Sequence, residues 1–508
     1  MTDHGIGSWI RTRARKSPDR PAVVFEDLTI SYAELMARIT RLANALRDRG
    51  VIAGDRVAYL GDNHPSFLES LFATATLGAI FVPLNTRLAT AEVAYQLADS
   101  GSSLLIAAEA LSALATGSAA SAGLARIILV SEKDAAGKGV DATSGIEDYE
   151  LVLEAASTEW FVSEVELSDP ALILYTSGTT GQPKGAILTH DNLTGNALNV
   201  LVDYDLGSRD RALMVSPLFH VASLGMGALP SILKGATVVL ERRFDPERAL
   251  ALIERHRVTW MSGVPTTFQL LAESPSWATT DLASLATLTC GGSPVPLAVI
   301  DAFELRGLSF TGGYGMTEAS PGVSSLAPGE IRSHPGSSGQ PHFFVDVRIA
   351  EPDEEGVGEI QIRGRNVIRG YWNREVLEAF TDDGWFRTGD LGRLDAEGYL
   401  YISDRLKDMV ISGGENIYPA EIELIIAELD AVSGVAVIGE PHERWGEVPL
   451  AIVTLRPGHT LGHDELQAHL ADRVARYKIP KRVIVVEELP RTASGKVQKA
   501  RLREQYGR

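Results

Sequence analysis

The sequence predicts an α/β protein with a large N-terminal domain of layered sheets and helices, a small β-barrel-like part, and a small α+β domain at the C-terminus. Three observations lead to this prediction. The chain has 508 residues, which is more than one ordinary domain holds. Short apolar runs rich in β-branched residues alternate with helical patterns over most of its length. After about Gly336, shorter strand-like runs separated by Gly-rich turns replace this alternation.

The clearest predicted helix covers residues 31–50. Ser31 and Glu34 form a capping-box pair at its start, and Gly50 ends it. One apolar stripe follows the helical period, at Leu35, Ile39, Leu42 and Leu46. Nearly continuous apolar runs are typical of strands in parallel sheets covered on both faces, and they occupy residues 56–60, 79–84, 103–108, 126–131, 171–176, 212–217 and 236–241. The Ala-, Gly- and Ser-rich stretch from Ala108 to Gly145 is interpreted as a surface excursion.

The C-terminal third of the chain has a different pattern of predicted elements. Residues 345–350, 358–364 and 398–403 are predicted to form hairpins. A last unit begins near Asp404 and is predicted to be a compact α+β domain. Its expected elements are a helix at 419–429, strands at 434–439 and 450–455, a helix at 464–477 ended by Pro480, and a strand at 482–489.

Composition and charge exclude several classes of protein. Lys and Arg number 47 and Asp and Glu 66, so the net charge of −19 argues against a nucleic-acid partner. Cys290 is the only cysteine, which excludes an internal disulfide and a Cys-based zinc site and fits a reducing cytoplasm. The first 20 residues lack the apolar segment of a signal peptide, and no run is long enough to span a bilayer. Trp9 and Ile10 beside basic residues could touch an anionic membrane, but an ordinary first helix is favoured.

The segment "LILYTSGTTGQPKGAILTH", residues 172–190, has the composition of a phosphate-binding loop. Its glycines let backbone N–H groups approach an anion, and Lys184 adds a positive charge. The spacing is not that of the P-loop, because Pro183 stands where the second glycine is needed and Gly185 follows the lysine. Taken alone, the segment could also be a flexible surface loop.

Four further segments match one chemistry. In "GGYGMTEAS", residues 312–320, Tyr314 can stack on a base and Glu318 can hold Mg²⁺ between phosphate oxygens. In "GWFRTGDLG", residues 384–392, the two oxygens of Asp390 can accept both ribose hydroxyls. Residues 403–423 supply Arg405, Lys407 and the pair Gly413–Gly414, and "PRTASGKVQK" supplies Lys496. Alone, Lys496 would be an ordinary surface lysine.

With these motifs in this order, the chain resembles the adenylate-forming superfamily, which includes acyl-CoA synthetases, adenylation domains of non-ribosomal peptide synthetases and firefly luciferase. The resemblance covers essentially the whole chain and is greatest to stand-alone bacterial fatty-acyl-CoA ligases, on "GWFRTGD", "DRLKDMVISGGENIYPAEIE" and "ARYKIPK". It implies ATP, Mg²⁺ and CoA. A carboxylate would attack the α-phosphate of ATP to give acyl-adenylate and pyrophosphate, and a thiol would then displace AMP.

The resemblance also assigns the nucleotide site. Lys496 would bridge the carboxylate and the α-phosphate, where charge gathers in the transition state. Thr176 and Glu318 would lie near Mg²⁺, and Asp390 and Arg405 would hold the ribose. The remaining contacts to ATP or AMP would come from Ser177, Gly178, Thr179, Thr180, Lys184, Gly291, Gly292, Ser293, Gly313, Tyr314, Gly315, Met316 and Thr317.

The resemblance implies a C-terminal domain that rotates between the two steps. Residues 1–403 would form the nucleotide- and acyl-binding domain, 404–407 the hinge around Lys407, and 408–508 the mobile domain. One face of that domain would present Lys496 for adenylation. The other would present Gly413 and Gly414, whose lack of side chains would let the pantetheine arm of CoA pass.

The acid is expected to be apolar. The family position of His220 favours a gate beside the adenylate carbonyl, although it could be a structural histidine. An amino acid is disfavoured, because no carboxylate stands at this position to hold its ammonium. The stretches expected to line the pocket are apolar, which favours a fatty, aromatic or bulky terpenoid acid. The expected lining residues are Phe219, His220, Val221, Leu224, Gly227, Val264, Phe268, Gly312 and Gly313.

Four alternatives are considered at this point. A carrier-protein phosphopantetheine thiol could replace CoA, or the enzyme could be specialised for one half-reaction. A luciferase-like oxygenase acting on the adenylate is also compatible with the fold. A catalytically silent nucleotide-binding protein is disfavoured, since the chain has Lys184, Glu318, Asp390 and Lys496. His459 and His463 stand four residues apart, but no third ligand is evident and no zinc site is expected there.

Overall fold

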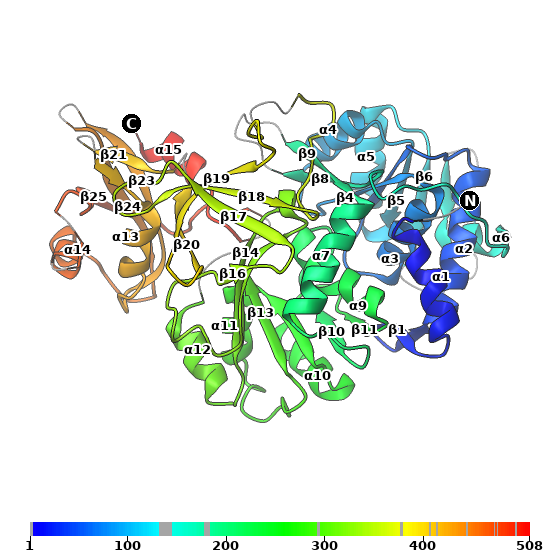
Figure 1. Cartoon of the computed structure of the whole chain (residues 1–508), viewed down its shortest axis with the longest axis horizontal. Helices are drawn as coiled ribbons and strands as arrows, with labels where there is room; N and C mark the ends of the chain where they lie inside the picture. Colours follow the sequence, from blue (N-terminus) through cyan, green and yellow to red (C-terminus); the bar gives the residue numbers. More distant parts are fainter. Residues whose placement is uncertain are drawn as a thin grey trace. The chain divides into compact units, whose positions relative to one another are not determined.

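The structure is a computed structural model that describes residues 4–131, 145–176, 183–291, 295–375, 379–405, 408–412, 415–442, 445–471, 473–474, 476–492 and 495–507 (Figure 1). The chain packs as two compact units, Met1–Asp346 with Arg363–Phe380 and Val347–Ile362 with Thr381–Arg508. The second unit includes strands that the sequence analysis assigns to the N-terminal domain. The predicted hinge at residues 404–407 stays a prediction.

The first unit contains a seven-stranded sheet with the strand order β7-β6-β5-β3-β4-β8-β9. All neighbours in it are parallel except β8 and β9, which form an antiparallel pair. Its strands are β3 (Arg56–Leu60), β4 (Ile80–Leu84), β5 (Leu104–Ala108), β6 (Ile127–Val130), β7 (Ile146–Asp148), β8 (Pro170–Thr176) and β9 (Lys184–Thr189). Their β-branched and leucine side chains are buried, as predicted for a sheet that is covered on both faces.

A nine-stranded sheet of the same unit has the order β16-β15-β14-β13-β12-β10-β11-β1-β2. The strands from β14 to β1 are parallel, and antiparallel strands complete both edges. They are β1 (Pro21–Phe25), β2 (Leu28–Ser31), β10 (Arg211–Met214), β11 (Thr237–Leu240), β12 (Trp260–Gly263), β13 (Thr287–Gly291), β14 (Phe310–Gly315), β15 (Gly322–Leu326) and β16 (Gln340–Pro341).

Helices cover the two sheets, and α7 contacts both of them, at β9 and at β15 (Figure 1). The capping box of α2 forms as predicted, and the stripe Leu35, Ile39, Leu42 and Leu46 is fully buried. The α-helices of this unit are α1 (Gly7–Lys16), α2 (Tyr32–Asp48), α3 (Pro65–Leu77), α4 (Thr90–Ser100), α5 (Ser112–Ala122), α6 (Tyr149–Ala155), α7 (His190–Asp203), α8 (Val221–Ser223), α9 (Leu229–Lys234), α10 (Pro246–His256), α11 (Pro265–Ala272) and α12 (Leu297–Glu304). Short 3₁₀ turns η1 (Glu109–Leu111) and η3 (Thr317–Ala319) and a π-helical turn η2 (Leu224–Ala228) complete it.

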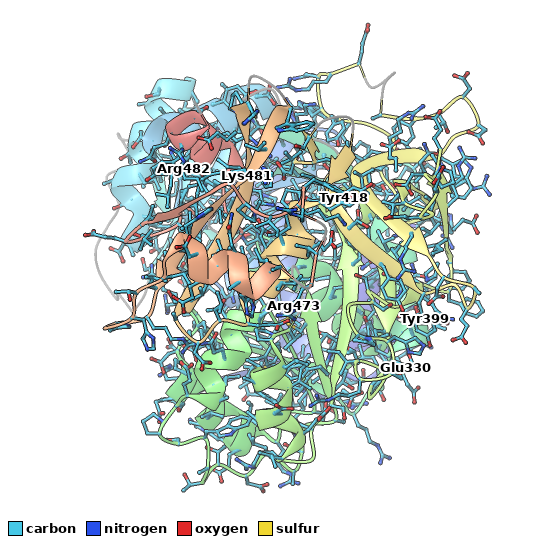
Figure 2. All side chains as sticks on the ribbon, turned by 90° about the vertical axis from the view of Figure 1, so that its left-hand side faces the viewer. Glu330, Tyr399, Tyr418, Arg473, Lys481 and Arg482 are labelled. Carbon is cyan, nitrogen blue, oxygen red and sulfur yellow. The ribbon has the colours of Figure 1, made fainter. Side chains whose placement is uncertain are left out.

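The second unit holds two sheets. The strands predicted at 345–350, 358–364 and 398–403 form, and a further strand joins them in a four-stranded sheet of β17 (Val345–Ala350), β18 (Gly358–Gly364), β19 (Phe386–Leu394) and β20 (Leu400–Arg405), in which β19 is antiparallel to both β18 and β20. The second sheet contains β21 (Val410–Ser412), β22 (Glu415–Ile417), β23 (Val432–His442), β24 (Gly446–Leu455) and β25 (Arg482–Val485). Its helices are α13 (Pro419–Ile426), α14 (His463–Leu470) and α15 (Lys499–Tyr506). Tyr418, which is labelled in Figure 2, lies just before α13. Its hydroxyl donates a hydrogen bond to a carboxylate oxygen of Asp353 at 3.2 Å.

One prediction about local structure is wrong. The helix predicted at 464–477 ends at Leu470, because the chain must turn there to bring Ile479 back to the core and Arg482 beside Leu450 of β24. The stretch from Ala108 that is interpreted as a surface excursion contains helix α5, which was not predicted, and strand β6 at the place of the strand predicted at 126–131; its residues 132–144 lie outside the described part. Alanine is the strongest helix former, and Ala115 and Ala119, four residues apart, bury one face of α5.

Within the described ranges, no helix is long and apolar enough to cross a membrane.

Candidate active site

Lys184 begins β9, directly opposite the last residue of β8. Thr176 and Lys184 are paired across the antiparallel ladder, and the Thr176 hydroxyl donates to the Lys184 carbonyl at 3.5 Å. The carbonyl of Pro183 accepts hydrogen bonds from the Tyr95 hydroxyl and from Arg374 Nη2, both at 3.3 Å. These hydrogen bonds fix the end of the Gly-rich segment, so Lys184 is held on the edge strand of the seven-stranded sheet.

The structure brings Lys184 and Glu318 together through Tyr371, a residue that the sequence analysis did not select. The Tyr371 hydroxyl donates to Glu318 Oε1 at 2.9 Å, and Lys184 Nζ lies 5.7 Å from the centroid of the Tyr371 ring. Burial first, and then the negative charge of Glu318, raise the pKa of the Tyr371 phenol, so that it stays a hydrogen-bond donor at neutral pH. A cation, a phenol and a carboxylate thus meet from three segments of the chain.

Backbone contacts hold Glu318 in place. It is 8% exposed and lies in η3, which follows β14. The Glu318 carbonyl accepts from the backbone N–H of Ile368 at 2.9 Å. Asn366 Nδ2 donates to the carbonyls of Ala319 and Gly322 at 2.7 and 2.6 Å, which fixes both ends of the turn. The carboxylate is therefore preorganised, as a site for a cation bound between phosphates needs.

Glycines occupy the carboxyl ends of β13 and β14, which are neighbouring parallel strands. Gly291 is aligned with Gly313, and Cys290 with Gly312. A Cβ on Gly313 would lie 2.7 Å from the Ser324 carbonyl oxygen, and one on Gly315 would lie 2.2 Å from that of Pro321. Only glycine fits at these two positions. The carboxyl edge of a parallel sheet is where α/β proteins bind ligands, and this row leaves backbone exposed there.

Some of the other residues that are predicted to contact the nucleotide lie in the described part of the chain, and some do not. Tyr314 is half-buried, and its hydroxyl points to the sulfur of Met316 at 4.0 Å. Thr317 begins η3. Ser177, Gly178, Thr179, Thr180, Gly292 and Ser293 lie outside the described residues.

The predicted acyl-pocket residues lie around α8, η2 and α11. His220 caps α8 and is half-buried, with its ring centroid 4.8 Å from that of Phe219. Phe219 and Val221 are almost fully buried, and Val264 is half-buried. Leu224 and Phe268 expose no surface, and the Phe268 ring packs 4.9 Å from that of Phe310, which makes it part of the core beneath these strands.

Gly227 is also buried. A Cβ there would lie 2.4 Å from the sulfur of Met214, so any side chain at this position must first displace that methionine.

In the second unit, Asp390 and Arg405 are paired on the adjacent strands β19 and β20. Asp390 is 5% exposed, and its backbone N–H donates to the Thr388 hydroxyl at 3.1 Å. Lys496 is exposed in a turn that Thr492 closes, with hydrogen bonds of 3.2 and 2.7 Å between the two residues. Lys407, Gly413 and Gly414 lie outside the described residues, as does the side chain of Arg405.

Comparison with known proteins places this site in a family. Residues 10–372 match the family model of the AMP-binding enzyme, and residues 421–496 match that of the AMP-binding enzyme C-terminal domain. The chain belongs to the AMP-binding enzyme family. It is 48% identical to the feruloyl-CoA synthase of an Amycolatopsis species over 100% of both chains. It is 41% identical to the indoleacetate–CoA ligase of Aromatoleum aromaticum over 99% of this chain and 98% of that one.

The solved structures agree with this placement. ATP-bound MatB from Rhodopseudomonas palustris superposes with a TM-score of 0.90 and is 31% identical, with 100% of this chain and 99% of that chain covered. The predicted fold and the predicted reaction class are confirmed: this AMP-binding enzyme is an ATP-dependent acid–CoA ligase. The roles of its individual residues stay predictions.

Proposed function

We propose that this AMP-binding enzyme activates an aromatic carboxylic acid as its acyl-adenylate and transfers the acyl group to CoA. The observation that carries this choice is the similarity along the whole chain to two ligases named for aromatic acids, feruloyl and indoleacetate, at 48% and 41% identity. The apolar residues around His220, with no carboxylate or arginine among them, support an apolar acid over an amino acid or a dicarboxylate.

The residues present suit adenylation. Lys184 would bind the leaving phosphates and Thr317 the α-phosphate, while Asp390 and Arg405 would hold the ribose, with Asp390 accepting hydrogen bonds and Arg405 donating them. Lys496 would offset the charge that builds up between the carboxylate and the α-phosphate. His220 would close the pocket beside the reacting carbonyl.

Mg²⁺ fits the donor set that is present. Among the described residues there is no cluster of three or more His, Cys, Asp or Glu side chains that could enclose a metal. Mg²⁺ commonly binds through one or two protein oxygens together with water and phosphate oxygens. Glu318, held by Tyr371, would supply one ligand, and Thr176 would lie near by. When bound with ATP, the ion neutralises phosphate charge.

Thioester formation would use the other face of the C-terminal domain. We propose a hinge at residues 404–407, centred on Lys407, and a pantetheine path past Gly413 and Gly414. The CoA thiol would attack the acyl carbonyl, and AMP would leave. We place the reaction in the cytoplasm, where ATP and CoA are supplied and where Cys290 would stay reduced.

A panel of acids tests the proposal. The enzyme is incubated with ATP, Mg²⁺ and CoA and with arylpropenoic, arylacetic, medium-chain fatty and long-chain fatty acids, and thioesters and AMP are measured by mass spectrometry. Aromatic acids should give the highest kcat/KM. Lys496→Ala should slow turnover by about 10²–10³, whereas Arg501→Ala, at a nearby exposed position, should not. A clear preference for fatty acids would contradict the proposed substrate class, and transfer only to a carrier-protein thiol would contradict the proposed acceptor.

A further inference from the structure

Lys496 stands in a short turn that is braced by its own hydrogen bonds. The two sides of the turn pair as an antiparallel bridge at Arg491 and Val497. Arg491 Nη1 donates to the Gly495 carbonyl at 2.8 Å, and Gln498 Nε2 donates to the Arg491 carbonyl at 3.1 Å. Because the turn is braced internally, the direction in which it presents Lys496 depends on how the turn is joined to the rest of the domain.

The turn leads directly into α15, and the first residue of this helix forms an ion pair. Lys499 Nζ lies 2.8 Å from Oε1 of Glu423, which belongs to α13. The same oxygen accepts the backbone N–H of Val437 at 2.6 Å, on β23, which ends the strand order of its sheet. One carboxylate thus joins α13, β23 and α15.

This ion pair is largely shielded from water. The side chain of Lys499 is 14% exposed and that of Glu423 is 21% exposed, and Lys499 is the only described cation within ion-pair distance of the carboxylate. Water screens an exposed ion pair and leaves it weak, but it has little access to this one. Loss of either partner would leave an uncompensated charge in a poorly hydrated place. The pair therefore fixes the start of α15.

A second ion pair fixes the rest of α15. Arg503 follows Lys499 by four residues, so the two side chains lie on the same face of the helix. Arg503 Nη1 is 2.8 Å from Oδ1 of Asp408, the first residue after the proposed hinge. Between them, Leu502 is 1% exposed and packs with residues of β23 and β24, and α15 contacts β23 (Figure 1). The helix therefore connects the turn of Lys496 with the hinge end of the domain.

We infer that Lys499 and Glu423 are a positioning pair for adenylation, which holds the turn so that Lys496 reaches the carboxylate and the α-phosphate. This inference rests on the role of Lys496 in the proposed function. The two residues contact no substrate and act through the start of α15. A displacement of about 1 Å in a reacting group can slow a reaction by about 10²-fold, so a small movement of the turn is enough. Thioester formation does not use Lys496 and does not depend on the pair.

The test measures the two half-reactions separately in the full-length enzyme, with the acid of the panel that the wild type converts fastest. Lys499→Met removes the charge and keeps an unbranched side chain. It should slow acid-dependent pyrophosphate release by about 10- to 100-fold. Conversion of presynthesised acyl-adenylate and CoA to acyl-CoA should keep the wild-type rate, which also shows that the domain is folded. Lys499→Arg keeps the cation and should restore part of the adenylation rate.

Two further variants separate positioning from folding. Glu423→Gln combined with Lys499→Met removes both charges and keeps an acceptor for the Val437 N–H, so no unpaired charge remains. This double variant should adenylate as slowly as Lys499→Met alone, because the two residues act as a unit. The matched control is Arg473→Met, which breaks an exposed ion pair with Glu428 in the same unit and should change neither half-reaction; Arg473 is labelled in Figure 2.

Failure of this inference can be told apart from failure of the proposed function. If Lys496→Ala leaves adenylation unchanged, the proposed role of Lys496 fails and the inference with it. If Lys496→Ala slows adenylation but the double variant adenylates at the wild-type rate, the inference alone is wrong. Equal loss of both half-reactions in the double variant would also overturn it, because that result would assign the pair to the stability of the whole domain.

Discussion

Replacing Tyr371 with phenylalanine tests whether the phenol holds Glu318 for catalysis. The change removes one hydrogen bond, from the hydroxyl to Glu318 Oε1 at 2.9 Å, and keeps the ring beneath Lys184 Nζ. A hydrogen bond to a charged group contributes about 1.5–3 kcal/mol, whereas the retained cation–π contact contributes about 0.5–1 kcal/mol. At about 1.4 kcal/mol per factor of ten, Tyr371→Phe should slow adenylation by roughly 10- to 150-fold.

The assay is acid-dependent pyrophosphate release at saturating ATP over a range of Mg²⁺ concentrations. Part of the loss should be recovered at high Mg²⁺, because the variant carboxylate is present but poorly oriented. Tyr371→Leu should lose a few-fold more, since it also removes the ring. Tyr401→Phe, in the second unit, is the control. An unchanged rate at every Mg²⁺ concentration, in a variant that melts at the wild-type temperature, would refute the role assigned to Tyr371.

Three further predictions concern other residues of the chain. Asp390→Ala should weaken ATP binding at least tenfold, because it removes charge-assisted hydrogen bonds that contribute roughly 1.5–3 kcal/mol together. Calorimetry measures the affinity, and an unchanged value would refute the contact between Asp390 and the ribose. Lys496→Ala should form acyl-adenylate about 10²–10³ times more slowly but should still convert presynthesised acyl-adenylate to acyl-CoA. A bulky residue at Gly414 should leave adenylate formation intact and stop thioester formation. Equal loss of both half-reactions in Lys496→Ala would contradict two orientations of the C-terminal domain. Burial lowers the pKa of His190 from 6.5 to about 4, and its Nδ1 accepts from Ile6 N at 3.2 Å. Between about pH 6.5 and 4, His190 is therefore protonated in the unfolded chain but not in the folded chain, and the free energy of unfolding decreases as the pH is lowered through this range. The decrease in the free energy of unfolding between pH 7 and pH 5, measured with urea, should be about 2 kcal/mol smaller in His190→Leu than in the wild type. An equal decrease in the two proteins would show that His190 does not titrate in this way.

Local signals predicted much of this fold. The capping box of α2 and its buried stripe follow from residues a few positions apart, and they form as expected. Seven strands of the two large sheets, β3, β4, β5, β6, β8, β10 and β11, were predicted because a strand buried on both faces is apolar along its whole length. The other strands of these sheets were not predicted. The same reasoning failed for residues 464–477, where helical periodicity continues but the chain must turn to pair β25 with β24.

The candidate site was only partly predictable for the same reason. Lys184, Glu318 and Asp390 stand in motifs whose composition indicates their chemistry. Tyr371 does not, because its role depends on a contact with Glu318, 53 positions away. Its one local signal is the Gly-Tyr pair at residues 370–371, which resembles the Gly-Tyr-Gly around Tyr314.

The central claim is that the acid passes through an acyl-adenylate, and the fate of the carboxylate oxygen tests it most directly. A substrate acid labelled with ¹⁸O in its carboxylate is converted with ATP and CoA, and the products are analysed by mass spectrometry. Attack of the carboxylate on the α-phosphate, followed by attack of the thiol on the carbonyl, transfers one labelled oxygen to AMP, and this is the predicted result. Label in orthophosphate, together with ADP, would show activation through an acyl phosphate and would contradict the account.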